Sequence, residues 1–205
     1  MHKEILTKQQ AELLPYIANF KRSFYLVGGT AIALHLGHRR SIDFDLFTSS
    51  RLDKSKIKSK LNQVPFKQVM LFEDVDQLHK LINGVKFTFF SFPYQIRHEI
   101  AIEKIISMPD LLTLASMKAF ALGRRSKWKD YVDLYFILKE HYSIKEISEE
   151  ANKNFPSQFS EKLFREQLAF HKDIDYSEPV EYIGEEIPEE EIKNFLVEKA
   201  IDLEL

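Results

Sequence analysis

The 205-residue sequence contains no cysteine. This absence excludes disulfide bonds and thiolate chemistry, and a zinc ion would have to be bound by histidines and carboxylates alone. The chain also lacks any run of about 18 consecutive apolar residues, the length that a membrane-spanning helix needs. Its first residues, MHKEILTKQQAELL, have the pattern of an amphipathic helix and not of a signal peptide. We therefore expect a cytoplasmic protein that does not associate with membranes.

The composition provides enough apolar material for a folded core. Hydrophobic residues make up 44% of the sequence and charged residues 29%, which is typical of a globular protein with one large domain or two small ones. No internal repeat or low-complexity tract is present. The organisation of the chain must therefore be inferred from the spacing of its apolar residues.

The net charge of −2 hides an uneven distribution of charge along the chain. Residues 1–140 contain 22 lysines and arginines against 14 aspartates and glutamates, a balance of +8, whereas residues 141–205 contain 7 against 17, a balance of −10. The basic runs 51–60 and 123–130 are either contact surfaces for a polyanion or solvated faces of ordinary helices and loops. We interpret the acidic run 184–191 as a solvated linker that leads into a helix.

The apolar pattern predicts an α/β part followed by a helical part. In the first part we expect helices at 4–19, 30–37 and 51–63, and strands at 23–29, 41–47, 66–74 and 85–94. Residues 74–84 are polar, contain a glycine and are expected to connect the last two strands. From Pro109 onward the pattern is helical, at 109–125, at 127–141 and in shorter amphipathic segments beyond. We place the domain boundary at this change, which gives domains 1–108 and 109–205.

Two aspartates occupy alternate positions of the predicted strand 41–47. Since successive side chains of a strand point to opposite faces, Asp43 and Asp45 share one face, while Ile42, Phe44 and Leu46 point into the core. The two carboxylates, about 6.6 Å apart at Cα, would repel each other without a cation between them. Hard oxygen ligands at this spacing suit Mg²⁺, or Mn²⁺ in its place, with further ligands from substrate phosphates. The competing interpretation is a pair of polar positions on a half-buried strand.

A glycine turn precedes these aspartates. Gly28, Gly29 and Thr30 stand where the predicted strand 23–29 meets the next helix. Adjacent glycines let the backbone approach a phosphate closely, and the start of a helix presents unpaired N–H groups and the positive end of its dipole. Thr30 can cap the helix or donate its hydroxyl. The combination predicts a phosphate-binding turn beside the metal pair, although a glycine pair alone serves many turns without a ligand.

The segment between the turn and the aspartates contains further polar residues. Arg40 and Ser41 are candidates for phosphate contacts, and structural packing is an equally weighted alternative for both. We interpret His35 and His38 as structural or exposed histidines and not as metal ligands.

The combined pattern resembles a known family. A GG[ST] turn, about a dozen residues and then DxD flanked by apolar residues resembles the signature of the DNA polymerase β-like nucleotidyltransferase superfamily. More narrowly, LVGGTAIALHLGHRRSIDFDLF is similar to the AbiEii/AbiGii-type toxin family. That family carries a helical C-terminal region with a lysine and a later aspartate, which match Lys118 in ASMKAFALGRR and Asp130 in KWKDYVDLYF. The resemblance covers residues 20–140 and implies an α+β fold, with a mixed-sheet nucleotidyltransferase domain followed by a helical region.

The resemblance also implies an activity. Characterised relatives transfer nucleoside monophosphates, some of them to tRNA ends, and the family is implicated in abortive phage infection and in toxin–antitoxin pairs. In such a reaction an acceptor hydroxyl attacks the α-phosphate of a nucleoside triphosphate and pyrophosphate leaves. The implied partners are a nucleoside triphosphate, an RNA acceptor such as tRNA, and a cognate antitoxin protein.

Roles for individual residues follow from the same resemblance. The two aspartates would bind the metal, and the glycine turn would position the triphosphate. Lys118, which we expect to be an exposed helix residue, would neutralise phosphate charge. Asp130 would either orient Lys118 or act as a base on the acceptor hydroxyl, with Asp133 assisting. The RNA acceptor would dock against the basic part of the chain, where we expect attraction from Lys54, Lys56, Lys58 and Lys60.

One departure from the family pattern concerns a third carboxylate. Polymerase β-like enzymes usually carry it on a following strand, and the matching place here is Thr88 in GVKFTFFSF. A threonine is neither a base nor an anionic metal ligand. Three possibilities follow: Asp130 takes the role of the missing carboxylate, one metal ion suffices for the reaction, or the activity is weakened. Other acidic residues, which we expect at the surface, are Asp74, Asp76, Glu99 and Glu103.

Two other functions are compatible with these residues. The first is a catalytically weak nucleotide-binding or partner-binding module, which Thr88 and the acidic C-terminal part favour. The second is a nucleotidyltransferase that modifies a protein or a small molecule, since the same chemistry serves any acceptor hydroxyl.

Overall fold

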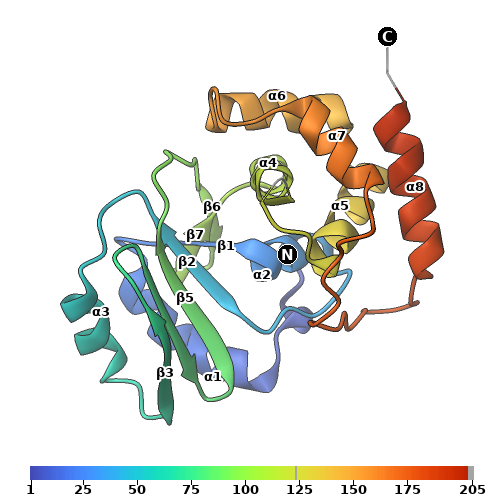
Figure 1. Ribbon diagram of the computed structural model, residues 1–205. Helices are drawn as coiled ribbons and strands as arrows, with labels where there is room; N and C mark the ends of the chain where they lie inside the picture. The colour runs from blue at the N-terminus through green and yellow to red at the C-terminus, as the bar shows by residue number, and fades with distance from the viewer. Residues whose placement is uncertain (123, 203–205) are drawn as a thin grey trace. The chain divides into compact units, whose positions relative to one another are not determined.

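A computed structural model describes residues 1–122 and 124–202. The chain divides into two compact units, Met1–Asp110 and Leu111–Leu205. The first unit contains both strands and helices, and a set of helices forms the second (Figure 1). Gly123, which belongs to the predicted helix 109–125 and to the basic run 123–130, lies outside the described residues, as do residues 203–205.

The first unit contains a five-stranded sheet. Its strands are β1 (Tyr25–Val27), β2 (Phe44–Thr48), β3 (Gln68–Glu73), β4 (Gln77–Ile82) and β5 (Val85–Ser91). They lie in the order β1-β2-β5-β4-β3. The β2–β5 pair is parallel and the other pairs are antiparallel. The predicted α+β fold with a mixed sheet is therefore confirmed.

Helices and a small hairpin accompany this sheet. The helical elements are η1 (Lys3–Ile5), α1 (Lys8–Ile17), η2 (Ala18–Phe20), α2 (Gly28–Leu36) and α3 (Lys54–Leu61). The hairpin consists of β6 (Ile100–Ile102) and β7 (Ile106–Met108). Side-chain caps fix two helix starts, because Thr7 accepts from the N–H of Gln10 in α1 and Asp53 accepts from the N–H of Lys56 in α3.

The second unit is helical, as the sequence predicts. Its helices are α4 (Leu111–Leu122), α5 (Trp128–Glu140), α6 (Ile144–Asn154), α7 (Glu161–Ala169) and α8 (Glu189–Ile201). Helix α4 packs against α6, and α7 packs against α8 (Figure 1). Of the helices in the described part of the chain, none is both long and apolar enough to cross a membrane.

Phenylalanines form the core of the first unit. Phe44 of β2 and Phe87 and Phe89 of β5 are fully or almost fully buried. Phe20 and Phe24, from the segment before β1, pack on Phe89 with ring centroids 4.9 and 5.3 Å away. Each fully buried ring of this kind contributes roughly 1.5–3 kcal/mol. These contacts pack η2 against β5, which pairs in turn with β2, the strand of the candidate site.

The predicted polar connection at residues 74–84 is wrong, because residues Gln77–Ile82 form β4. This strand pairs with both β3 and β5. Its core face carries Leu78 and Ile82, which are fully buried, with Lys80 between them. Because Lys80 stands between these two apolar residues, the alternation of apolar and polar residues that would predict a strand is interrupted.

A second correction concerns the start of β2. Ile42 is 48% exposed, whereas Phe44 and Leu46 are fully buried. The strand begins only at Phe44. The alternation of faces expected from residue 42 therefore holds from Phe44 onward, and Ile42 does not join the core.

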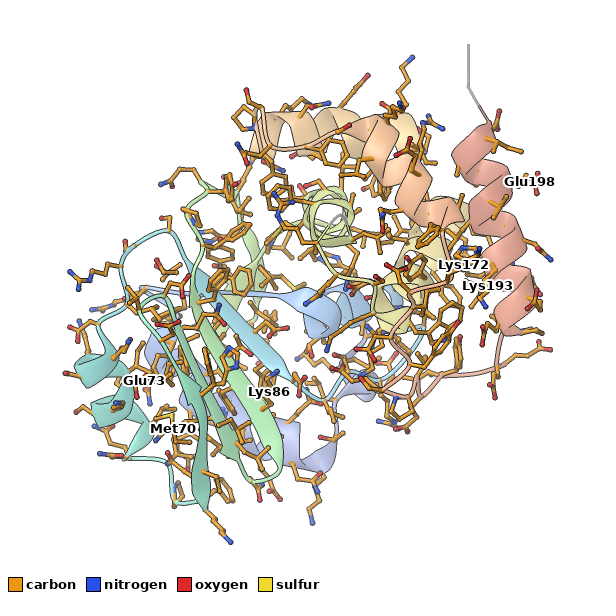
Figure 2. All side chains as sticks on the ribbon, viewed as in Figure 1. Met70, Glu73, Lys86, Lys172, Lys193 and Glu198 are labelled. Carbon is orange, nitrogen blue, oxygen red and sulfur yellow. The ribbon has the colours of Figure 1, made fainter. Side chains whose placement is uncertain are left out.

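Strand β3 lies at the end of the strand order and exposes apolar side chains. The side chains of Val69, Met70, Leu71 and Phe72 are 41% to 49% exposed. The register with β4 shifts between Met70 and Phe72, so that Leu71 has no partner residue in β4 and forms a bulge. Beyond the bulge, Glu73 turns its carboxylate toward α3, as Figure 2 shows.

Candidate functional site

The pairing of β1 with β2 brings the glycine turn to Asp45. Val27, the last residue of β1, lies opposite Asp45, and Gly28 follows it directly. A Cβ added at Gly28 would lie 2.1 Å from Oδ2 of Asp45, so the carboxylate occupies the space that a side chain would fill. The φ angle of Gly28 is +72°, a left-handed conformation that glycine adopts without strain. Both the backbone and the neighbouring carboxylate therefore require glycine at this position.

Helix α2 begins within the turn and not after it. Its first residues are Gly28, Gly29 and Thr30, whereas the sequence predicts a start at residue 30. The N-cap residue Val27 provides no side-chain acceptor for the first N–H groups of the helix. The start of α2 thus presents backbone donors and the positive end of the helix dipole next to Asp45. This arrangement is suited to an anion such as a phosphate.

Hydroxyl groups hold the segment that leads into β2. The Oγ1 of Thr30 donates to the backbone carbonyl of Asp43 and lies 3.0 Å from Oγ of Ser41. The side chain of Gln10 donates to the carbonyl of Ser41 at 2.8 Å. Thr30, Ser41 and Gln10 are all buried. These bonds fix the backbone of Asp43, while the predicted phosphate contacts of Thr30 and Ser41 stay predictions.

The two aspartates flank a core residue. Asp43 precedes β2 and Asp45 is its second residue, and both side chains are partly exposed on either side of the buried Phe44. In the described part of the chain, no group of three or more histidine, aspartate or glutamate side chains is arranged to bind a metal. Two carboxylates fit Mg²⁺ nevertheless, because this ion usually takes one or two protein carboxylates and completes its shell with water and phosphate oxygens.

Arg39 lies beside the glycine turn, although the sequence does not indicate it as a site residue. A Cβ added at Gly29 would lie 2.7 Å from Nη2 of Arg39, whose side chain is almost fully buried. Arg39 therefore places a positive charge beside the start of α2. The neighbouring Arg40 donates to the carbonyls of Glu4 and Ile5 at 3.4 and 3.5 Å, and its predicted phosphate contact stays a prediction. Because Arg39 and Arg40 are adjacent and identical, the sequence does not indicate which of them lies beside the glycine turn.

Thr88 lies in register with Asp45 on the neighbouring strand. The pairs Asp45–Thr88 and Thr88–His79 form a row across β2, β5 and β4. Nε2 of His79 is buried and has no hydrogen-bond partner among the described residues. Burial lowers the pKa of His79, the charge of Lys86 lowers it further, and Asp45 acts in the opposite direction. Thr88 thus lies between Asp45 and His79 in this row, and its match to the third carboxylate of the family stays a prediction.

The helical unit contains a buried cluster of charges. Nζ of Lys118 in α4 lies 2.7 Å from Oδ1 of Asp130 and 3.0 Å from Oδ2 of Asp133, both in α5. The Lys118 side chain is 5% exposed, and the two aspartates are buried as well. The expectation of an exposed Lys118 is therefore wrong. Helix α4 is apolar around most of its circumference and offers no solvated face at this residue.

Arg125 completes this cluster. Its Nε donates to Oδ2 of Asp130 at 2.9 Å, so that both oxygens of this carboxylate are bound by cations. Burial raises the pKa of Asp130, but the charges of Lys118 and Arg125 outweigh burial and hold the pKa below its ordinary value. A carboxylate with a lowered pKa accepts protons poorly. This geometry favours an orienting role for Asp130 over the role of a base.

Comparison with known proteins identifies the family. Residues 14–107 match the family model described as nucleotidyl transferase AbiEii toxin, type IV TA system. The uncharacterized protein aq_aa25 of Aquifex aeolicus (strain VF5) is 32% identical over 157 residues, which cover 73% of this chain and 76% of that protein. The chain belongs to the AbiEii nucleotidyltransferase toxin family. As an AbiEii family member it is a nucleotidyltransferase, in agreement with the glycine turn and the aspartate pair.

Solved structures share the fold of this AbiEii family member. The nucleotidyltransferase toxin MenT4 from Mycobacterium tuberculosis H37Rv has a TM-score of 0.60 at 12% identity, over 94% of this chain and 80% of that chain. A protein of H. pylori described as a candidate nucleotidyltransferase has a TM-score of 0.59 at 14% identity, over 94% and 91%. JHP933 from Helicobacter pylori has a TM-score of 0.55 at 15% identity, over 95% and 91%. The AbiEii sequence pattern and the nucleotidyltransferase fold therefore agree.

Replacing Gly28 is expected to damage both stability and activity. In Gly28→Ala, the left-handed φ costs about 1–2 kcal/mol, and the displaced carboxylate of Asp45 adds about 1–3 kcal/mol of overpacking. We expect urea denaturation to show a loss of roughly 2–5 kcal/mol in the free energy of unfolding. Transfer of labelled nucleotide should fall to background, because Asp45 leaves its place.

Gly84→Ala is the matched control. Gly84 has a similar φ of +79°, but a Cβ there meets no atom within 4 Å. Gly84→Ala should therefore lose only the conformational contribution of about 1–2 kcal/mol and keep its transfer activity. Equal losses of stability in the two variants would show that the Asp45 contact is unimportant.

Removing the lysine of the buried cluster is expected to destabilise the helical unit. Lys118→Met leaves the carboxylates of Asp130 and Asp133 buried without this cation, which typically costs about 3–5 kcal/mol. We expect urea denaturation to show this loss. Lys139→Met is a suitable control, because Lys139 and its partner Glu191 are about half exposed, and it should cost at most about 1 kcal/mol.

Two further measurements separate charge from packing. Adding Asp130→Asn and Asp133→Asn to Lys118→Met should restore part of the lost stability, since the unpaired charges disappear. In the parent protein, the lowered pKa of Asp130 stabilises the fold above its ordinary value of 3.8, and this contribution disappears as the pH falls through the folded-state pKa. A Lys118→Met variant as stable as the parent would contradict the proposed importance of the ion pairs.

Proposed function

We propose that this AbiEii family member is a Mg²⁺-dependent nucleotidyltransferase that transfers a nucleoside monophosphate from a nucleoside triphosphate to a hydroxyl of RNA, with tRNA as the favoured acceptor. We propose further that this reaction makes it the toxin of a toxin–antitoxin pair in the cytoplasm, with a cognate antitoxin protein as its partner. The observation that supports the proposal most is the contact between Gly28 and Asp45, which places the start of α2 beside a carboxylate pair.

The proposed chemistry needs little covalent participation by the protein. The acceptor oxygen forms a bond to the α-phosphorus, and the bond to the pyrophosphate oxygen breaks. Asp43 and Asp45 would hold Mg²⁺, which when bound stabilises charge on the phosphate oxygens. The N–H groups at the start of α2 would orient the triphosphate, and the buried guanidinium of Arg39 adds positive charge there. Catalysis would then rest on positioning and electrostatics.

The assignments of Lys118 and Asp130 as site residues stay predictions. The ion pairs with Asp130 and Asp133 hold the ammonium of Lys118 in one position, which suits a point charge that acts on a phosphate. Because both oxygens of Asp130 are occupied by cations, we propose that Asp130 orients Lys118 and does not act as the base.

RNA is favoured as the acceptor by the charge of the N-terminal part of the chain. A balance of +8 over residues 1–140 attracts a polyanion more strongly than it attracts a neutral acceptor. Thr88, in register with Asp45, and the acidic C-terminal part of the chain favour the rival function of a binding module with weak activity. A nucleotidyltransferase acting on a protein or a small molecule is the other alternative.

Nucleotide binding is expected to depend on Asp43 and Asp45. The double variant Asp43→Asn/Asp45→Asn should lose the Mg²⁺-dependent part of triphosphate binding, because amide groups are poor ligands for this ion. Calorimetry with and without Mg²⁺ measures this difference. Asp74→Asn, a change at an exposed aspartate outside the site, should bind as the parent does. Unchanged binding in the double variant would refute the proposed metal site.

The acceptor can be identified by labelling. Incubation with each labelled nucleoside triphosphate, Mg²⁺ and total tRNA should produce labelled RNA with the parent protein and none with Asp45→Asn. If the protein is a toxin through catalysis, Asp45→Asn should also relieve the growth inhibition that expression of the parent causes. Label on a protein or small molecule, with none on RNA, would exclude the RNA acceptor. Equal growth inhibition by the parent protein and by Asp45→Asn would favour the binding-module function.

A further inference from the structure

A cavity lies in the N-terminal unit, away from the glycine turn. Its volume is about 390 Å³, and its lining includes Tyr25 of β1 and the residues that follow β2. Tyr25 pairs with Phe47, whereas Val27 at the other end of β1 pairs with Asp45. The cavity therefore opens at the opposite end of the β1–β2 pair from the candidate site. We call it the β1–α3 pocket, because helix α3 forms a further wall.

Cationic side chains dominate the lining of the β1–α3 pocket. They are Lys21, Arg22, Arg51, Lys56 and Lys60. The acidic residue of the lining, Asp53, accepts a hydrogen bond from the backbone of α3 as its N-cap. Burial lowers the pKa of Lys60, and the charges of Lys56 and Arg22 lower it further. These cations therefore repel one another, and an anion in the pocket would remove this repulsion.

The lysines of α3 divide into two pairs with different surroundings. Lys58 donates to Glu73 of β3 at 2.8 Å, and Lys54 lies 3.9 Å from the same carboxylate, which Figure 2 shows beside α3. Lys56 and Lys60, one helical turn apart, belong to the lining of the pocket. Lys60 donates to the carbonyl of Asn19, which leaves it further N–H groups for a ligand. The pair Lys54/Lys58 is thus a matched control for the pair Lys56/Lys60.

Tyr25 also belongs to the lining of this pocket, and its hydroxyl is an unused donor. The residue is 4% exposed, and its phenol oxygen is buried without a hydrogen-bond partner among the described residues. Its ring stacks on the exposed His98 with centroids 4.4 Å apart and an angle of 6°. Burial raises the pKa of Tyr25, so that the phenol keeps its proton and can donate. Buried tyrosine hydroxyls usually have a partner. Because this oxygen is buried, a ligand in the pocket would become its partner only after a small movement of the pocket wall.

We propose that the β1–α3 pocket binds a phosphate group, either of an RNA chain or of a free nucleotide. Lysines and arginines around it provide charge-assisted hydrogen bonds, and the phenol of Tyr25 provides a neutral one. The volume lies in the range of about 300–1,000 Å³ that is usual for small-molecule sites, so the pocket has room for a phosphorylated nucleotide unit. This binding does not depend on the proposed transfer reaction at Asp43 and Asp45.

The experiment compares two double variants of the full chain in an Asp43→Asn/Asp45→Asn background, which removes the candidate nucleotide site. Calorimetry with inorganic pyrophosphate should show binding about a hundredfold weaker in Lys56→Gln/Lys60→Gln, at roughly tenfold for each lost charged contact. Lys54→Gln/Lys58→Gln should bind pyrophosphate as the background does, because Lys54 and Lys58 pair with Glu73 and lie outside the pocket lining. Tyr25→Phe, which keeps the ring, should weaken binding by about fivefold. Urea denaturation of each variant confirms that it is folded.

A short RNA oligonucleotide distinguishes the two sources of phosphate. If RNA occupies the pocket, Lys56→Gln/Lys60→Gln should weaken RNA binding and reduce the slope of log K against log salt by about 1.4, at roughly 0.7 per single-strand contact. If only pyrophosphate binding weakens, the ligand is a free nucleotide, and the proposal still holds. If both lysine variants bind both probes equally well, the pocket is not a phosphate site. Since the background lacks Asp43 and Asp45, none of these outcomes depends on transfer activity.

Discussion

The carboxylate of Asp45 can reach the backbone of residue 28 only because that residue has no side chain. A methyl group there would lie 2.1 Å from the carboxylate oxygen. The rest of the site follows from this approach: β1 must end at Val27, opposite Asp45, and the chain must turn at once into α2. Thr30 then reaches back to the carbonyl of Asp43 and fixes the second aspartate. The absence of a side chain at residue 28 is therefore required by three features together: the register of β1 with β2, the start of α2 and the position of Asp45.

The helical unit is organised around a different constraint, which is the cost of burying charge. Lys118, Arg125, Asp130 and Asp133 are paired so that no carboxylate oxygen of Asp130 is left without a cation. Buried ion pairs add little net stability compared with apolar residues of similar size, but they tolerate few other arrangements. The cluster therefore determines how α4 and α5 align more than it strengthens their packing. The ammonium group of Lys118 is therefore held in one position by protein carboxylates and not by water.

The sequence predicts the parts of this structure that depend on local order. Alternation predicts that Asp45 lies between the buried Phe44 and Leu46, and the glycine pair predicts the turn, because both signals lie within a few residues. It does not predict β4, since Lys80 interrupts the apolar face and pairing with β3 and β5 is needed to recognise the strand. The burial of Lys118 depends on α5 in the same way. Arg39 and Arg40 are indistinguishable until the fold places one of them at Gly29.

The bulge in β3 has a consequence for how the chain behaves in concentrated solution. An outer strand with exposed Val69, Met70 and Phe72 would normally recruit a strand from another molecule, which is the first step of edge-to-edge aggregation. At Leu71 the ladder of backbone donors and acceptors loses its regular spacing, and the strand twists locally. An incoming strand can match only the short stretch on either side. At this edge the irregular backbone opposes such pairing, while the apolar side chains remain available for contact.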